Sequence, residues 1–557
     1  VSYAALARTL TVTNISKKPV SLELLDGLTA ILPCGINNWF MKEMSRTIEA
    51  WMTVEEEAGV CLFKLSTDPR DTSDVAFVKG ANFYVSFREG QKPTDSRVIV
   101  DPRRIFGAAT DFSAPVLFEA RTPFTFPKDQ IARNITPCAF TLVGSKLGRG
   151  QSIALHTLVG HMFDVADVRR QKIAAVNAAF IDAKRRENHE LIDGIMDRAF
   201  TASGSPHFDQ YVRQTYLDNV LRGGLPVTLE ANGRSKTVYV FSRKHGDLER
   251  DYNRFQVAST YFSEGEGNYR DVNQNRRSDL FFEPHIGARN ILDFVNLIQP
   301  DGYNPLVFKG VRYTVAQDVF EKSALASSFN DQDRRKLAHV LTKPFALGDL
   351  LRYMEENHIV SSRPREEFLV GILKMASEQE EAAFGEGYWS DHWTYNTDLL
   401  ENFRAVYPDR FRSLLLEEKI FTYFDTHAFL KPRAERYVLR HGALRQYHGV
   451  FCDEEKNALI QRRKEAKHQV RAGYGSGEVI RVTLFDKLLC LVVNKIATLD
   501  PSGVGIEMEA DKPNWYDSLN GLPGLFGSSV SETFELKRLV LFLREALDGF
   551  NLKDDAQ

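Results

Sequence analysis

Three polar and aromatic loops stand out in this sequence because their residue types could hold and cleave a sugar. The first loop, residues 264–277, reads EGEGNYRDVNQNRR and comes directly before a stretch of helical periodicity. It combines carboxylates that accept, arginines that donate through a planar fork and flexible glycines, a mixture that binds sugar hydroxyls through paired hydrogen bonds. The alternative interpretation is an ordinary exposed polar loop.

The second loop, residues 385–393, reads GEGYWSDHW and opens a helical stretch. Asp391 lies between Trp389 and Trp393 in the sequence, and apolar walls of this kind could raise the pKa of its carboxyl group. A general acid that works near neutral pH needs such a raised pKa. The helix start opposes this effect because its dipole favours the carboxylate, so a plain N-cap is an equally good interpretation of Asp391.

The third loop, residues 514–529, reads NWYDSLNGLPGLFGSS and precedes a helical stretch from about Glu532. Asp517 and Asn520 are the polar candidates that it offers. A structural loop built on glycine and proline is the alternative interpretation.

Other patterns predict structure and no chemistry. His156 and His161 are five residues apart on an expected strand, which puts them on opposite faces, so we expect no metal site. The glycine-rich run 473–477 lacks the strand and the closing Lys of a phosphate loop and predicts a flexible loop. The charge run 462–471 predicts a solvated helix face.

The elements that must position these loops change character along the chain. Up to about residue 162, short apolar runs of period two alternate with turns, which predicts an antiparallel β-sandwich over 1–162. The composition then shifts to Ala, Arg, Lys and Glu, which predicts a helical linker over 163–204. Helical periods with polar-aromatic loops between them dominate 205–557, and they favour an α/α barrel with its chemistry on one rim.

Composition excludes several classes. The 71 Lys and Arg residues against 74 Asp and Glu leave no basic excess for nucleic acid, and no apolar run approaches the roughly 18 residues of a membrane span. Five cysteines without CxxC spacing argue against a disulfide framework and fit a reducing, cytoplasmic location. The chain opens with Val1 in an expected strand, so we expect the true N-terminus to be absent.

Taken in order, the three loops resemble motifs of the cellobiose and chitobiose phosphorylases. Residues 269–274 resemble that family's YRDSNQ loop, and residues 389–391 its Trp-Ser-Asp motif. Residues 514–520 are similar to its ADWNDCLN loop, and Ser529, Val530 and Glu532 to the GESV that follows.

The resemblance implies a multidomain α and β fold, in which an N-terminal antiparallel β-sandwich and a helical linker precede an (α/α)6 barrel that is incomplete here. It implies that Asp391 is the general acid, that Trp389 lines the sugar subsite and that the first loop contributes to the sugar site. Arg270 and Asp271 would hold hydroxyls of the transferred sugar. The substrate-binding residues expected in all are Arg270, Asp271, Asn273, Gln274, Arg276, Trp389, His392, Trp393, Asp517 and Asn520. Inorganic phosphate would be a co-substrate, with no metal and no organic cofactor.

Two departures refine the resemblance. His392 stands where the family has a second Asp, and a helical stretch between Phe320 and Gly385 separates the first two motifs. Both features resemble the larger β-glucan phosphorylases, including those that act on β-1,3-linked oligoglucans. The family's phosphate-binding His and Thr lie after the third motif, whereas this chain stops at Gln557. We therefore expect that both ends are missing or that a second chain supplies the C-terminal part, and we expect a homodimer.

The expected reaction is inverting phosphorolysis of β-linked gluco-oligosaccharides, which releases α-glucose 1-phosphate. An inverting β-glucan hydrolase is the nearest alternative, with Glu264, Glu266 or Asp517 as the base to water. A carbohydrate-binding or scaffold protein that has kept the barrel without catalysis is the alternative from another class.

Overall fold

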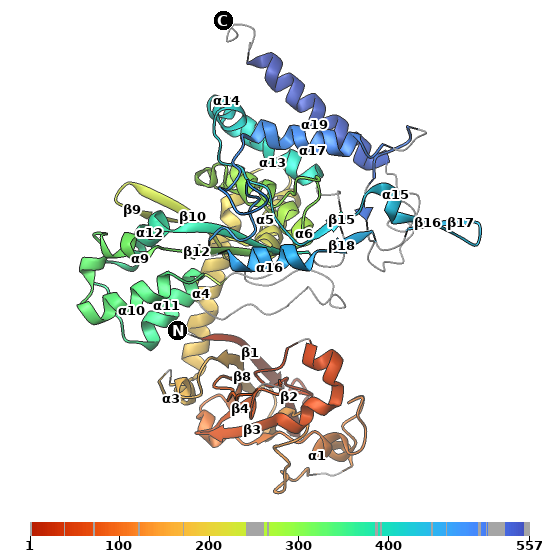
Figure 1. The fold of residues 1–557 in the computed structure, drawn as a ribbon. Coiled ribbons are helices and arrows are strands. Elements are labelled where there is room, and N and C mark those ends of the chain that lie inside the picture. The colour runs from red at the N-terminus through yellow and green to blue at the C-terminus, as the bar shows by residue number, and fades with distance from the viewer. Residues whose placement is uncertain are drawn as a thin grey trace, which may run out of the picture. The chain divides into compact units, whose positions relative to one another are not determined.

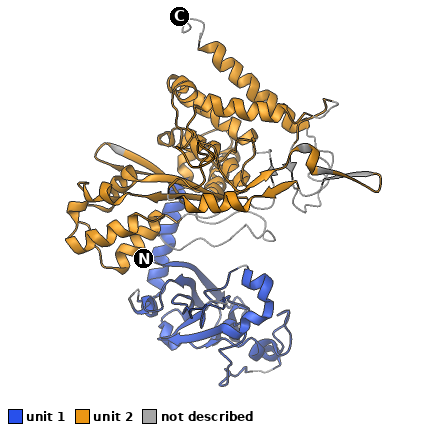
Figure 2. Ribbon diagram, in the orientation of Figure 1, with its two compact units in different colours: residues 1–195 blue, residues 196–557 orange. Residues whose placement is uncertain are grey.

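The computed structural model describes residues 3–37, 39–70, 73–120, 123–170, 172–240, 261–263, 267–384, 388–389, 393–446, 449–463, 465–499, 503–507, 509–510 and 530–550. It is a mixed α and β structure with an N-terminal region of antiparallel sheet and many helices (Figure 1). The chain divides into two compact units, Val1–Ile195 and Met196–Gln557, called here the N-terminal and the C-terminal unit (Figure 2). The division falls within the predicted linker.

The strands of the N-terminal unit form two antiparallel sheets. The first sheet has the order β1 (Ala4–Thr13), β8 (Ser152–Met162), β5 (Ala81–Arg88), β4 (Val60–Leu65) and β3 (Met52–Glu57). The second has the order β2 (Val20–Leu28), β7 (Ala139–Leu147) and β6 (Val98–Ile99). The short antiparallel strands predicted up to residue 162 are thereby confirmed.

The first sheet is covered on both faces. Phe63 and Tyr84 share a core with Val98 of the second sheet. Leu62 and Phe83, whose side chains point the other way, share a different core with apolar residues of the linker, which are Val168, Ile173, Val176 and Ile181. This explains why β4 opens with the apolar run VCLF, since a strand that is buried on both faces has no polar side. The linker helix α4 (Ala178–Met196) therefore begins as part of the N-terminal unit.

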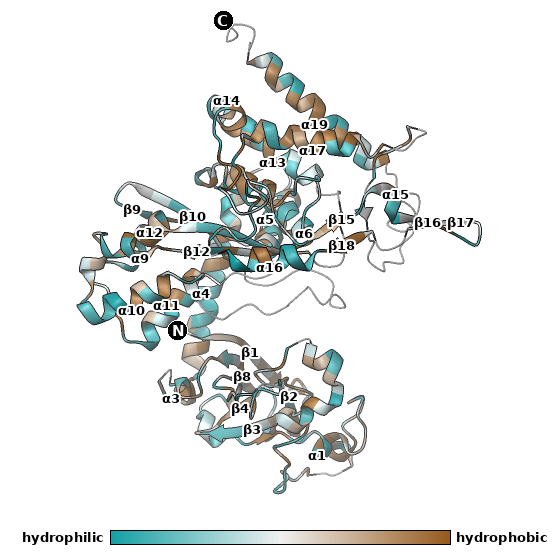
Figure 3. Cartoon of the chain, in the orientation of Figure 1, coloured by the Kyte–Doolittle hydropathy of each residue, from teal (hydrophilic) through white to brown (hydrophobic). Residues whose placement is uncertain are grey.

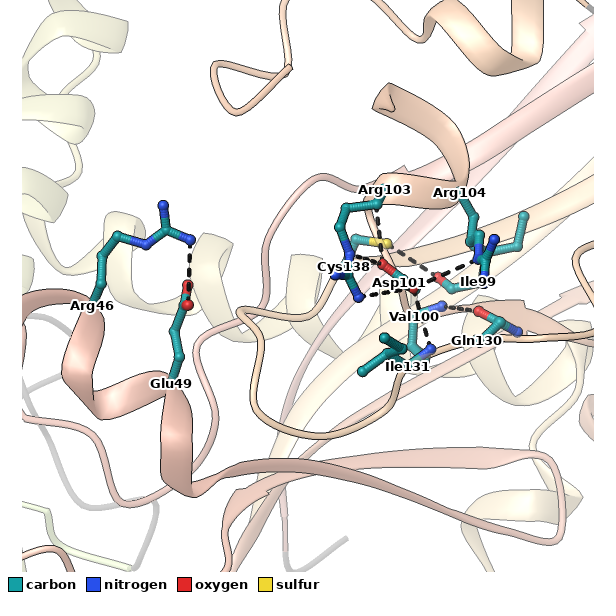
Figure 4. A network of polar contacts seen from close by, with 10 residues as sticks. All are labelled: Arg46, Glu49, Ile99, Val100, Asp101, Arg103, Arg104, Gln130, Ile131 and Cys138. Carbon is teal, nitrogen blue, oxygen red and sulfur yellow. Dashed lines mark hydrogen bonds and ion pairs between the residues drawn. The ribbon is translucent and has the colours of Figure 1, made fainter. Parts of the chain in front are cut away.

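A buried carboxylate binds several groups just after the last strand of the second sheet in the N-terminal unit (Figure 4). Asp101 follows β6 and is only 1% exposed, so its charge needs partners. Its oxygens accept from Arg103 Nε at 3.0 Å and from the Ile131 amide at 3.2 Å, while Arg104 Nε lies at 3.7 Å. Both arginines come from the short helix α1 (Arg103–Phe106), so this network fixes the local turn after the strand.

Helices form the main core of the C-terminal unit. Apolar side chains of these helices gather in one cluster, with Phe294, Leu400, Phe403 and Leu415 entirely inaccessible to solvent. The helices are α6 (Tyr269–Arg276), α7 (Asp279–Phe282), α8 (Arg289–Val295), α13 (Trp393–Val406), α14 (Pro408–Leu416), α17 (Leu484–Ile496) and α19 (Val530–Gly549). Figure 3 shows apolar and polar residues alternating along α19. No helix in the described part of the chain is long and apolar enough to cross a membrane.

A second core joins helices to strands within the same unit. Its strands are β9 (Leu225–Ala231), β10 (Arg234–Val240) and β12 (Val307–Thr314), and its helices are α9 (Gln317–Glu321), α10 (Asp331–Leu341), α11 (Leu347–Glu356) and α12 (Arg365–Met375). These helices confirm the helical stretch predicted after Phe320 as far as Met375.

Two local predictions in this unit are wrong. The helical periodicity that begins at Arg365 predicted one helix, but α12 ends at Met375 and the segment SEQEEAA forms β13 (Ser377–Ala383), paired with β12. These residues are good helix formers in isolation, and the open edge of β12 together with ion pairs from Glu378 to Arg289 and Lys236 overrides that preference.

The charge run after residue 462 is not a helix face, since α16 (Glu454–Arg462) ends there. The Arg463 side chain is 7% exposed and donates to Asp425 Oδ2 at 2.7 Å and to the Gly475 carbonyl at 3.2 Å. Arg471 donates to the Gly477 carbonyl at 3.2 Å. The glycine-rich segment is thus a turn held by two arginines, where the sequence predicted a flexible loop.

Candidate functional site

Residues of the first loop form a short strand and then helix α6, whose start is capped by a side chain. Residues Gly267–Asn268 form β11, in which Asn268 pairs with Val307 of β12. The Asn268 side chain then caps the helix by accepting from the Arg270 amide at 2.9 Å. A cap of this type satisfies a free amide of the first turn, so the sequence N-Y-R-D both ends the strand and starts the helix.

The second loop leaves the same small sheet. Val307, which pairs with Asn268 on one side, pairs with Ala383 of β13 on the other. The preceding residue, Leu306, accepts from the Tyr269 amide at 2.7 Å and donates to the Phe384 carbonyl at 3.2 Å. Because neighbouring strands lie about 4.8 Å apart, the chains that enter the first and second loops run about 10 Å from each other.

Buried hydrogen bonds join α6, which is formed by residues of the first loop, to α13, which begins at the last residue of the second loop. Asn273 Nδ2 of α6 donates to Asn396 Oδ1 of α13 at 2.7 Å, and Asn396 Nδ2 donates to the Tyr269 hydroxyl at 3.2 Å. That hydroxyl donates in turn to the Phe294 carbonyl of α8 at 2.8 Å. The first turns of α6 and α13 are therefore held side by side in the interior.

A pair of two-residue strands places the segment before the third loop beside the second loop. Residues Tyr388–Trp389 form β14, which pairs antiparallel with β19, Glu509–Ala510, with Trp389 opposite Glu509. The backbone of the second loop thus lies beside the chain that leads to the third. Helix α19, which follows the third loop, packs against α13.

The first loop presents three of its predicted residues to solvent at least in part. The Arg270 side chain is 37% exposed and the Asp271 side chain 14%, and Arg270 Nε lies 3.4 Å from Asp271 Oδ1. Gln274 is exposed one turn further along α6. A half-exposed donor fork beside a carboxylate at a helix start can bond two neighbouring hydroxyls.

Three other predicted residues are buried. Asn273 is 0% exposed and Trp393 is 1% exposed in the core of the helical cluster. Arg276 is 2% exposed, its Nε donates to the Gly223 carbonyl at 2.6 Å, and its guanidinium carbon lies 3.6 Å from the centre of the Tyr239 ring. These side chains brace the helices that carry the loops.

The remaining predicted residues lie outside the described residues. They are Asp391, His392, Asp517 and Asn520, together with Glu264 and Glu266 of the hydrolase alternative. Of Trp389 only the backbone is described.

Sequence reasoning missed a cluster of buried charges next to these loops. Glu507, two residues before β19, is 0% exposed, and its carboxylate accepts from Arg436 Nη1 at 2.5 Å and from the Tyr303 hydroxyl at 3.3 Å. The ammonium group of Lys495 lies 3.4 Å from the centre of the Tyr303 ring. Burial lowers the pKa of Lys495 to about 8, against the opposing effect of Glu507. The only signal in the sequence is the turn composition QPDGYNP around Tyr303, which predicts a loop and no role.

Burial also perturbs two carboxyl groups near the small sheet. It raises the pKa of Asp279 to about 7, although the Tyr239 hydroxyl donates to Asp279 Oδ2 at 3.0 Å. It raises the pKa of Glu380 on β13 to about 7, helped by the negative charge of Asp293. Within the described part of the chain, no group of three His, Cys, Asp or Glu side chains could hold a metal ion.

A surface groove of about 690 Å³ runs between α13 and α19 and is lined by residues such as Arg404, Phe534 and Arg538. On α13 it begins at Glu401, eight residues after Trp393, whereas on α19 it begins at Phe534, four residues after Val530. Its central cation is already paired, because Arg538 Nη2 lies 2.8 Å from Asp398 and 2.6 Å from Glu401. The groove therefore does not displace the loops as the candidate site.

No protein-family model matches this sequence, and a search of curated proteins finds no match.

Proposed function

We propose that this protein is an inverting glycoside phosphorylase of the cellobiose and chitobiose phosphorylase type, acting on β-linked gluco-oligosaccharides with β-1,3-linked chains preferred. One observation carries the proposal. The segments that enter or flank the three motif-like loops lie together, through the pairing of β11, β12 and β13, the bond from Asn273 to Asn396, and the pairing of β14 with β19. Three motifs that are far apart in the sequence thereby support one site.

In this proposal the C-terminal unit's helices belong to an (α/α)6 barrel, and the loops gather on one of its rims. Arg270 and Asp271 bind hydroxyls of the glucose that is transferred, with the partial exposure that such a contact needs. Asn273 and Arg276 keep α6 in place from within, and Trp389 covers an apolar face of the sugar.

The reaction needs one acid and one nucleophile. Asp391 gives its proton to the glycosidic oxygen while a phosphate oxygen attacks C1 from the opposite face. The C1–O bond of the β-linkage breaks, the C1–O–P linkage forms with α configuration, and the shortened chain leaves as an alcohol. An inverting hydrolase would need a second carboxylate as base to water, whereas phosphate is already a nucleophile and needs only to be held in line.

A coupled assay tests the proposal on the complete gene product with β-1,3-linked glucose oligomers. Glucose 1-phosphate that appears only when phosphate is added supports phosphorolysis. Reducing sugar released without phosphate would make the protein a hydrolase. Binding without either product would make it a carbohydrate-binding protein.

A further inference from the structure

The loop at residues 299–306 contacts segments that flank all three candidate loops. At its end, Leu306 forms backbone hydrogen bonds to Tyr269 of the first loop's helix and to Phe384 before the second loop. In its middle, the Tyr303 hydroxyl donates to Glu507 at 3.3 Å, next to the strand that leads to the third loop. One short loop therefore links the backbones that must be in register for the site to form.

The 299–306 loop is itself closed by its own hydrogen bonds. The Gln299 amide donates to the Tyr303 carbonyl at 2.7 Å, and the Gly302 amide donates to the Gln299 carbonyl at 3.0 Å. Gly302 has φ +82, a left-handed conformation in which a side chain would be strained. A loop fixed in this way can transmit a position from one neighbour to another.

Glu507 is the point where this loop and the segment before β19 are joined. Its carboxylate is bound on one oxygen by Arg436 of α15 (Arg433–Arg436) and on the other by Tyr303. Its amide donates to Thr498 Oγ1 at 3.1 Å, beyond the end of α17. A carboxylate and a guanidinium taken out of water together gain little net stability, so their value lies in the geometry that they impose.

The residues that follow Glu507 pair with the backbone of the second loop. Glu509 pairs with Trp389 only two positions after Glu507, and Trp389 is two residues before Asp391. We propose that Glu507 is a positioning residue: held by Arg436 and Tyr303, it fixes β19, and through the β19–β14 pair it fixes the backbone of Tyr388–Trp389, which leads to Asp391 in the sequence. This role in turnover rests on the proposed phosphorolysis, whereas the effect on the backbone does not.

Glu507→Gln and Tyr303→Phe test the proposal, since the first removes the charge and the second removes only the hydroxyl. Asp101→Asn is the matched control, because it neutralises a buried carboxylate that is paired with arginine in the other unit. We expect both test variants to lower kcat for phosphorolysis by about tenfold to a hundredfold, with KM for the oligosaccharide nearly unchanged, because a small misplacement of a reacting group has effects of this size. The double variant should lose less kcat than the two single losses multiplied together, because both changes disrupt the same contact between Tyr303 and Glu507.

Hydrogen exchange measured by mass spectrometry on the peptide spanning residues 384–393 gives a readout that needs no activity. We expect about tenfold faster exchange there in Glu507→Gln and Tyr303→Phe, and wild-type exchange in Asp101→Asn. If wild-type protein shows no phosphorolysis but this exchange pattern holds, the proposed reaction fails and the positioning role stands. Unchanged exchange in both test variants, or an equal loss of kcat in Asp101→Asn, would overturn the positioning role. Tyr303→Phe decides the question if Glu507→Gln does not fold.

Discussion

Asp101 in the N-terminal unit and Glu507 in the C-terminal unit are both buried carboxylates paired with arginine, but their partners come from different distances along the chain. Asp101 is bound by Arg103 and Arg104, two and three residues away. Glu507 is bound by Arg436 and Tyr303, which are 71 and 204 residues away. The two arginines that bind Asp101 complete a turn, and the Ile131 amide joins them from 30 residues away. The partners of Glu507 tie together segments that meet only in the folded chain. A site made of loops that are far apart in the sequence needs a network whose partners are also far apart in the sequence.

This comparison predicts that variants in the C-terminal loops change the reaction, while variants in the N-terminal network change only stability. The largest effect is expected for Asp391→Asn, which removes the proposed general acid and should cut phosphorolysis by about 10²-fold or more. The fold and the affinity for oligosaccharide should remain. Steady-state kinetics beside calorimetric titration measure both, and retention of most activity would remove Asp391 from the mechanism.

Arg270→Ala sharpens the comparison within the first loop. A hydrogen bond to a charged group is worth about 1.5–3 kcal/mol, so loss of the Arg270 guanidinium should lower turnover by roughly tenfold to a hundredfold. The loss should be the same for short and long oligosaccharides, since every chain presents the same terminal glucose. Kinetics over a series of chain lengths test this, and a loss confined to long chains would move the first loop to the acceptor side.

Trp389→Ala should weaken binding at the cleaved sugar by roughly 1–3 kcal/mol, because an indole covers an apolar sugar face and excludes water. Titration calorimetry gives the affinity for the oligosaccharide, and a thermal melt of the same variant gives its melting temperature. A lower melting temperature with unchanged affinity of the folded protein would make Trp389 a structural residue.

The smallest effect on the reaction, and a distinct effect on stability, is expected for Asp279→Asn. Burial raises the pKa of Asp279 to about 7, so between about pH 4 and pH 7 the folded chain holds a proton that the unfolded chain releases. The free energy of unfolding should therefore fall as pH rises through this window, and it should fall less in Asp279→Asn. Urea unfolding at about pH 5 and about pH 7.5 measures the difference, and an identical pH dependence in both proteins would contradict this assignment.

The sequence predicts local features of this fold better than long-range ones. The period-two runs identify β1 and β2 because strand alternation is written in adjacent residues. The same reasoning misses β13, since SEQEEAA has helical propensity and becomes a strand only beside β12. Arg463 reads as a solvated charge because its partner, Asp425, lies 38 residues away.

The candidate site shows the same difference between local features, which the sequence predicts, and long-range contacts, which it does not. The residue types of the first loop indicate Arg270 and Asp271, and their exposure agrees with a binding role. Burial of Asn273, Arg276 and Trp393 could not be predicted, because polar and aromatic residues near a site serve equally well as contacts or as supports. Glu507 could not be predicted at all, since its role depends on a tyrosine 204 residues away.

The most direct test of the central claim is a proton NMR spectrum of the products formed from a β-1,3-linked glucose oligomer and inorganic phosphate by the complete gene product. The proposal predicts α-glucose 1-phosphate, formed at the same rate as the shortened chain. Free glucose as the only new monosaccharide, or glucose 1-phosphate of β configuration, would contradict it.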